Sequence, residues 1–550
     1  DAARAACVSR AFLRFWRCHP NLTFSNKTLG LNENTCGKNG SASVFSSKSS
    51  ACGASLGHRL YQPFTLTASF TYAAGNYGNT EMKSSLDMSH SPWFAYYVRV
   101  GILNPPRRHS KKKVDHILGK HSGIGLKTLN IQIPSCFKVE DHCHLNSWLQ
   151  SALRPGIEEL KLICLPVKAK YDFPFSLLSN GSGDSIRSLH LSGCLFRPTA
   201  TVGALRSLTR LPLCCVRITD DKLGCLLSHS SALEQLQIRY CDRIVKLKVP
   251  CLLQRLTDLE VFGCEKLKVI ENKAPSLASF TFEGDTTVKL TLGETSKIKK
   301  LILYRSGSVF YARAKLPYSM PNLEALIITS RNEVACTPML NSKFIHLRHL
   351  YIALTGAPFS ATYDFLSLSS FLDAAPSLEA FDLNVSHCSW CHTISCYAGN
   401  VWQKNMGHVS IFADSKRVTG LCHAKSFVEL LCHILASTTS LQCLTFEAPQ
   451  SILRCSDPGN ISGKCWPMDR DILVEAHRSI LATRTYIEPK VPSTVKLLVL
   501  EPCSCHAVEL EKKLAFIKTR RWQEPLLSPK SPAPQLEESK TMTGGPHQSW

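Results

Sequence analysis

The chain lacks any uninterrupted apolar run of roughly 18 residues, so a membrane-spanning helix is not expected. Acidic residues are in short supply, because 42 Asp and Glu stand against 64 Lys and Arg and leave a formal net charge of +22. Such an excess favours acidic partners. The composition is not that of a disordered chain, since 44% of the residues are hydrophobic and 19% are charged, as in folded globular proteins.

The common catalytic motifs are absent as well. The sequence contains no GxxxxGK[ST] phosphate loop, no HExxH metal-binding pair, no GxSxG nucleophile elbow and no glycine-rich dinucleotide loop. These absences exclude the usual nucleotide, protease and hydrolase routes. We therefore expect a binding protein with no cofactor instead of an enzyme.

The 25 cysteines do not form the pattern of a disulfide framework, because they are spread along 550 residues instead of a short secreted chain. Many of them lie in apolar segments, where a thiol behaves as a small buried hydrophobe. We therefore expect a reducing compartment: the cytoplasm, the nucleus or both.

The pattern LxxLxL, with Ile, Val or Phe also at the apolar places, recurs about every 25 residues, as leucine-rich repeats do. Its second and third apolar residues alternate with polar ones, as in a strand with one buried face. This predicts an α/β leucine-rich-repeat solenoid, a horseshoe with a parallel concave sheet. Each returning segment, for example 221–232 or 363–377, is expected to be helical and to pack on the convex side. The copies begin at Leu126, Ile157, Ile186, Leu208, Leu233, Leu256, Leu277, Ile298, Leu323, Leu347 and Leu378, with two later ones at Leu441 and Val495.

Three copies end on a cysteine: Cys194, Cys241 and Cys264. A small residue fits the tight turn by which the chain leaves each strand, so we interpret them as structural. Metal binding is the alternative, but their spacing follows the repeat and not that of zinc ligands. Cys503, Cys505 and His506 follow a later copy and have the same interpretation.

The residues between the last two apolar places of each copy point to the concave face. In three successive copies these residues are apolar: Ile302, Ile327 and Tyr351. An exposed apolar row of this kind marks an interaction site, and we predict that it binds a partner with Lys300 and His349 beside it to set the charge preference. The alternative is that a later segment of the chain covers the row.

The first residues, DAARAACVSRAFLRFWRCHPNLTFS, have apolar residues at helical spacing followed by a Cys-His-Pro break. They resemble the second half of a plant F-box, with its VSRxFxxxW signature at Val8, Ser9, Arg10, Phe12 and Trp16. The later stretches KVDHILGKHSGIGLKTLNIQI and LTDLEVFGCEKLKVIE resemble grass F-box/LRR proteins that share the MIF1-like repeat domain.

This resemblance implies the substrate-recognition adaptor of an SCF-type E3 ubiquitin ligase. Its F-box would bind a Skp1-type adaptor in a cullin complex, and its repeats would bind an unknown protein substrate. The Leu-Pro helix with which an F-box opens is not in the sequence. A repeat scaffold without ligase coupling is therefore the alternative, and a basic nucleic-acid binder is a weaker one.

We divide the chain into a partial helical F-box and linker (1–35), an irregular insertion (36–112), the leucine-rich-repeat domain (113–510) and a disordered tail (511–550), which is rich in Pro, Ser and Lys. A compact basic run comprises Arg107, Arg108 and residues 111–113, and we interpret it as a solvated loop. A nuclear-import signal or a phosphate contact is the alternative.

One dense group of possible metal ligands lies in the segment HCSWCHTISC. We interpret it as a cysteine-rich loop between repeats. A tetrahedral zinc site is the first alternative, and haem attachment through the CxxCH form is the second. The group consists of His387, Cys388, Cys391, His392 and Cys396.

Overall fold

The computed structural model describes most of the repeat region. The described residues are 19–25, 109–121, 125–133, 139–164, 171–178, 181–198, 205–331, 333, 336–355, 363–386, 415–419, 425–437, 441–448, 455, 465 and 470–503. The F-box-like stretch at 1–18, residues 36–108, the cluster at 387–396 and the tail at 511–550 lie outside them.

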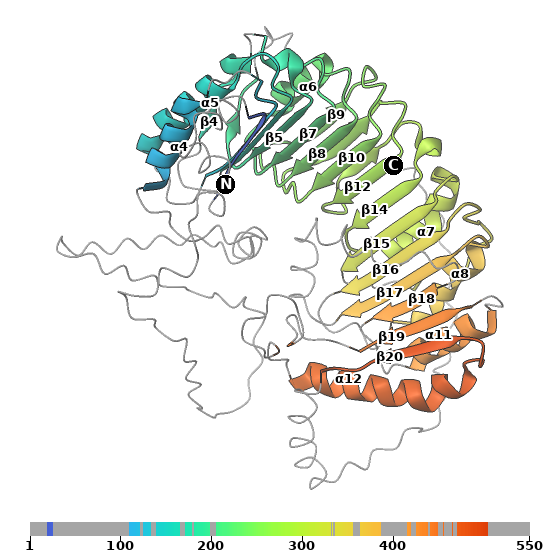
Figure 1. Cartoon of the computed structure of the whole chain (residues 1–550). Helices are drawn as coiled ribbons and strands as arrows, with labels where there is room; N and C mark the ends of the chain where they lie inside the picture. The colour runs from blue at the N-terminus through green and yellow to red at the C-terminus, as the bar shows by residue number, and fades with distance from the viewer. Residues whose placement is uncertain are drawn as a thin grey trace, which may run out of the picture.

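The described chain forms a horseshoe whose inner wall is one 15-stranded sheet, and the strands follow one another in chain order (Figure 1). Every recorded strand pair in this sheet is parallel, as between β8 and β10. Its strands are β1 (Asn21–Phe24), β2 (Thr128–Ile133), β3 (Glu159–Cys164), β5 (Ser188–Ser192), β7 (Arg210–Cys214), β8 (Gln235–Arg239), β10 (Asp258–Phe262), β12 (Ser279–Glu283), β14 (Lys300–Tyr304), β15 (Ala325–Arg331), β16 (His349–Thr355), β17 (Ala380–Ser386), β18 (Ser415–Thr419), β19 (Cys443–Glu447) and β20 (Lys496–Leu500).

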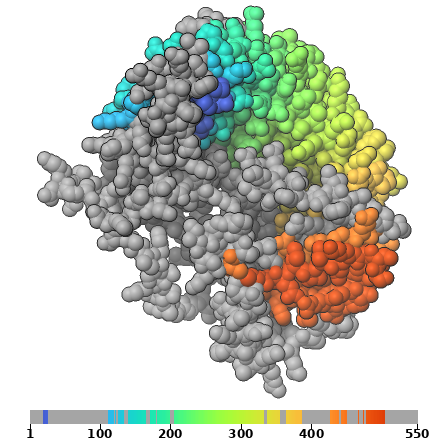
Figure 2. Space-filling view, viewed as in Figure 1, coloured from blue at the N-terminus to red at the C-terminus, as the bar shows by residue number. Residues whose placement is uncertain are grey.

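The apolar places of the repeat stack along the solenoid and form its core. Leu236 of β8 is in register with Leu259 of β10, which is in register with Phe280 of β12, and all three are fully buried. No repeat can bury such a row alone, so stacking supplies the core, and the packed repeats form one arch (Figure 2). The predicted leucine-rich-repeat solenoid is confirmed.

Two strands of the sheet were not predicted. Strand β1 lies in the segment assigned to the F-box and linker, and it pairs in parallel with β2. Residue 113 is therefore not the edge of the sheet. Strand β18 has the sequence SKRVT, whose single apolar residue gives no repeat signal, and its place comes from pairing with β17 and β19.

The return segments are helical at both ends of the horseshoe. The expected helices at 221–232 and 363–377 are found as α6 and as a 3-10 turn followed by α8. The helices are α4 (His109–Lys120), α5 (His142–Ala152), α6 (Asp220–His229), α7 (Ser308–Ser319), α8 (Ser369–Ala374), α11 (Lys425–Ser437), α12 (Arg470–Ala482), the π-helical turn η7 (Thr483–Ile487) and the 3-10 turns η2 (Val139–Asp141), η3 (Phe175–Leu178), η4 (Gly183–Ser185), η5 (Thr295–Lys297), η6 (Phe365–Leu368) and η8 (Glu488–Lys490).

In the middle of the horseshoe the returns are strands, which corrects the expectation of helices throughout the convex side. The strands β9 (Lys246–Val249), β11 (Val269–Asn272) and β13 (Lys289–Thr291) form a second parallel sheet. The copies here are only about 21 to 23 residues apart, which leaves too little chain for a helix. Nearer the N-terminus, β4 (Asp172–Phe173) pairs with β6 (Leu195–Phe196).

The part of the basic run that the structure describes is helical, and not the solvated loop that its composition predicts. Residues 111–113 lie in α4, which buries Val114 and Leu118 in the core. Lys111 forms an ion pair with Asp141, which precedes α5. Lys111 and Lys112 therefore lie on the polar side of an amphipathic helix, whereas Arg107 and Arg108 lie outside the described residues.

The turns after β5, β7, β8 and β10 repeat one backbone conformation. Gly193, Cys215, Tyr240 and Gly263 all have positive φ, between 51° and 70°. Three of these residues precede the cysteines of the repeat, Cys194, Cys241 and Cys264, which are at most 5% exposed. The thiols of Cys241 and Cys264 donate to backbone carbonyls, and burial raises the pKa of the Cys264 thiol to about 11. The thiols of Cys241 and Cys264 therefore act as neutral packing groups.

Candidate functional site on the concave face

The concave face carries three parallel rows of outward side chains, because the strands are paired without a shift of register. Between β2 and β17 the middle row is polar at its beginning and apolar in its centre. Its members are Asn130, Lys161, His190, Pro212, Gln237, Glu260, Thr281, Ile302, Ile327, Tyr351 and Asp382.

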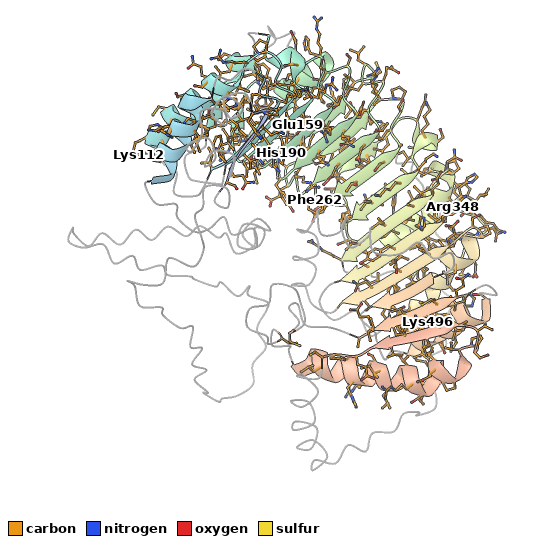
Figure 3. The ribbon with its side chains drawn as sticks, in the orientation of Figure 1. Lys112, Glu159, His190, Phe262, Arg348 and Lys496 are labelled. Carbon is orange, nitrogen blue, oxygen red and sulfur yellow. The ribbon has the colours of Figure 1, made fainter. Side chains whose placement is uncertain are left out.

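At the N-terminal end of this face the strands enclose a hollow of about 340 Å³. It is lined by side chains from β1, β2, β3, β5, β7 and β8, so no single repeat builds it. Figure 3 shows Glu159 and His190 over this part of the sheet. The lining is mostly polar and includes Thr23, Asn130, Glu159, Lys161, His190, Arg210, Pro212 and Gln237.

Two ion pairs neutralise most of the charge in and beside the hollow. Arg210 donates to Glu159 at 2.8 Å, and Arg239 donates to Glu260 at 2.9 Å. Neither pair includes Lys161, and no ion pair of this lysine is recorded within the described residues. The hollow therefore has one uncompensated positive charge at its centre.

The electrostatics of the hollow reflect this missing partner. Burial lowers the pKa of Lys161. Burial, with the charges of Lys161 and Arg239, lowers the pKa of His190 to about 4, so His190 is neutral at pH 7. In the same lining the buried Oδ1 of Asn130 has no hydrogen-bond donor among the described residues. A carboxylate or phosphate placed here would pair with Lys161 and favour a protonated His190.

The apolar row predicted from the sequence is formed, because Ile302 pairs with Ile327 and Ile327 with Tyr351. It is not exposed throughout. Ile302 and Tyr351 are half-buried, whereas Ile327 is only 6% exposed. Neighbouring strands lie about 4.8 Å apart, so the two flanking side chains shield the middle one.

The two polar residues predicted beside this row lie in the first row of the face. Lys300 is half-buried and His349 is exposed, and Ala325 of β15 lies between them. The structure thus places the five predicted residues on three adjacent strands, β14, β15 and β16. Their role in binding remains a prediction.

Sequence reasoning missed an aromatic group in the third row. The ring of Phe262 contacts those of Tyr240 and Tyr304, with centroids 5.5 Å apart in both edge-on pairs. Glu283 lies in register between Phe262 and Tyr304, and burial raises its pKa to about 7 although Arg331 opposes the shift. The signal was available for Phe262, Glu283 and Tyr304, which occupy the third outward position of their copies, whereas Tyr240 lies in the turn after β8.

Several other predicted groups have no structural description. The F-box-like residues Val8, Ser9, Arg10, Phe12 and Trp16 lie outside the described residues, as does the cluster from His387 to Cys396. Within the described part of the chain, no helix is both long and apolar enough to span a membrane.

The fold and its concave face define a leucine-rich-repeat protein, a class whose sheet surface serves protein interaction. Residues 117–504 match the family model described as the LRR domain of At1g61320/AtMIF1, and the chain belongs to this family. Comparison with curated proteins gave no match.

Among solved structures, a crystal structure of an internalin from Listeria monocytogenes is similar to this chain. It has 12% sequence identity and a TM-score of 0.33, and the alignment covers 63% of this chain and 90% of the internalin.

Proposed function

We propose that this chain is the substrate-recognition adaptor of an SCF-type E3 ubiquitin ligase and that its concave face binds an acidic segment of the target protein. The observation that carries the choice of target is the hollow around Lys161, whose charge has no recorded partner among the described residues while Arg210 and Arg239 are paired. The apolar row farther along the same sheet would anchor the rest of the target. The ubiquitin chemistry would belong to partner enzymes.

The support for ligase coupling comes from the F-box-like residues. Val8, Ser9, Arg10, Phe12 and Trp16 precede β1 directly in the chain, and Thr23 of β1 lines the hollow. A target in the hollow would therefore be held at the end of the solenoid that adjoins the F-box-like segment. The proposal implies a protein of the cytoplasm, the nucleus or both, with a Skp1-type adaptor and a cullin complex as partners.

The Lys161→Glu variant is expected to bind a fluorescein-labelled hexaglutamate peptide at least about 10-fold more weakly than the unchanged chain. A charge-assisted contact contributes roughly 1.5–3 kcal/mol, and the reversed charge also repels the probe. Fluorescence anisotropy at fixed salt measures the affinity, because a chain of net charge +22 attracts any polyanion at low salt.

Lys248→Glu is the matched control, since it makes the same change at an exposed position of β9, in the second sheet. It should bind the peptide as the unchanged chain does. Equal losses in the two variants would mean that overall charge, and not the hollow, attracts the peptide, and the assignment of the hollow would fail.

The ligase coupling is tested by capture of a purified Skp1-type adaptor. The chain from Asp1 is compared with a version whose F-box is completed upstream, and we expect the completed chain to bind. In the completed chain Trp16→Ala should lose the adaptor and keep the peptide, whereas Lys161→Glu should do the reverse. If the completed chain does not capture the adaptor, the ligase role is rejected and the repeat scaffold without coupling remains.

A further inference from the structure

Three cysteines from different segments of the chain meet at the C-terminal end of the described solenoid. The Sγ atoms of Cys455, Cys465 and Cys503 all lie within 4.8 Å of one another, and those of Cys455 and Cys503 are 3.3 Å apart. All three side chains are half-buried. From the sequence, Cys503 was expected to be a structural residue of a repeat turn. The other two cysteines are 38 and 48 positions away from it, so no local pattern indicated that the three lie together.

The cluster joins three segments of the terminal repeats. Cys455 follows β19, Cys465 precedes α12, and Cys503 follows β20, which is the last strand of the sheet. The backbone N–H of Ala448 donates to the carbonyl of Leu500 at 3.0 Å, so the same two strand ends are also joined by a hydrogen bond. The thiols thus converge at a defined place in the fold.

We propose that Cys455, Cys465 and Cys503 bind a zinc ion. Zinc prefers thiolate ligands at about 2.3 Å in tetrahedral geometry, which puts neighbouring sulfurs about 3.8 Å apart. Here the sulfurs of Cys455 and Cys503 are 3.3 Å apart and no pair of the three is more than 4.8 Å apart, so small shifts reach that spacing. The backbone N–H of Cys455 donates to Sγ of Cys465 at 3.3 Å, and a donor of this kind stabilises a thiolate ligand.

Two other arrangements of these sulfurs are less suitable. A disulfide requires an S–S bond of about 2.05 Å and would leave one cysteine of the three outside it, whereas a metal ion uses all three. Cys241 and Cys264 donate to backbone carbonyls of their own and the preceding repeat, whereas these three cysteines come from separate segments and lie close to one another. Cys505 and His506, two and three positions after Cys503, lie outside the described residues and are not part of this proposal.

The ion would act as a clip for the end of the horseshoe. It would close the segment between β19 and α12 onto the end of β20, and bridging distant parts of a chain removes conformational freedom from the unfolded state. Among the described residues, strand β20 is the last strand of the sheet. A clip at this position would hold the last repeat in place.

The test measures zinc in the purified full chain by plasma mass spectrometry and compares it with two double variants. Cys455→Ser/Cys503→Ser is expected to hold about one zinc per chain fewer than the unchanged protein. The control Cys225→Ser/Cys251→Ser, which changes cysteines of α6 and of a turn, should hold the same amount as the unchanged protein. Using the difference removes any contribution from the other cysteines of the chain.

A second measurement covers the case in which the double variant fails to fold. In the unchanged chain, Cys455, Cys465 and Cys503 should resist alkylation until a zinc chelator is added, as read by peptide mass spectrometry. Alkylation at full rate before the chelator would overturn the proposal. So would resistance that only a reductant removes, because it would identify a disulfide.

Discussion

Replacing Arg313 with methionine is expected to lower the free energy of unfolding by about 3–5 kcal/mol. Arg313 lies in α7 and is 1% exposed, and its guanidinium reaches two later segments of the chain. Nε donates to the carbonyl of Ser370 at 3.0 Å, Nη1 donates to Oγ of Ser342 at 3.1 Å, and Nη2 donates to the carbonyl of Leu340.

Methionine keeps much of the buried volume but leaves these three acceptors without their donor. A fully buried acceptor that loses its partner costs about 1–3 kcal/mol, and the cost is smaller for the carbonyl of Leu340, a residue that is 42% exposed, because water replaces the donor there. Helix α7 connects β14 to β15, so the loss should fall on the strands that carry the apolar row. Hydrogen exchange of the backbone amides in β14, β15 and β16 should therefore accelerate more than in β2 and β3.

Arg255→Met is the control for this prediction, since Arg255 is exposed in a turn. Urea unfolding should show that this variant changes the free energy of unfolding by no more than about 0.5 kcal/mol. If Arg313→Met unfolds at the same urea concentration as the control, the guanidinium contacts do not stabilise these repeats. Arg313→Lys should fall between the two, because an ammonium group cannot reach all three acceptors.

Gly193→Ala is expected to destabilise the solenoid by about 2–5 kcal/mol. A Cβ at this position would lie 1.9 Å from the carbonyl oxygen of Cys164 in the preceding repeat. The positive φ alone does not explain the loss, because Cys215 and Tyr240 adopt the same conformation at equivalent turns. Left-handed backbone costs roughly 1–2 kcal/mol, and relieving the overlap requires the two repeats to separate.

Gly224→Ala is the same substitution at another position, and it is expected to change the stability in the opposite direction. Gly224 lies inside α6, and a Cβ there would meet no atom within 4 Å. Alanine favours a helix by about 1 kcal/mol over glycine, so this variant should be slightly more stable. Thermal unfolding of both variants tests the pair; a Gly193→Ala chain as stable as Gly224→Ala would mean that the repeats are not packed this closely.

The strength of the sequence prediction follows from how local each signal is. The residues of LEQLQIRYC that become buried in β8 are identified by alternation within a single copy, and Cys241 by its place after the strand. Strand β18 has only Val418 as an apolar residue, so no local signal marks it, and its position depends on the strands on both sides. Helices were expected in all the convex returns, but the short returns that contain β9, β11 and β13 are strands. The length of a repeat, and not its periodicity alone, decides whether a helix fits.

The candidate site shows the same division. The sequence predicted which residues share the middle row, including Ile302, Ile327 and Tyr351, because the strand period fixes the direction of each side chain. It did not predict that Ile327 would be 6% exposed between its neighbours. The sequence also did not predict that Arg210 and Arg239 form ion pairs whereas Lys161 has none recorded among the described residues. An ion pair between strands depends on the side-chain rotamers of two repeats at once.

The sequence by itself determined that this protein is a leucine-rich-repeat solenoid with a concave parallel sheet, because a period of about 25 residues with one buried face has no other way to cover its core. Only the tertiary structure decided where charge is left uncompensated on that sheet and which cysteines meet at its end. Those properties depend on distances between side chains from different repeats. Such distances follow from the stacking of the whole chain and not from any single copy of the pattern.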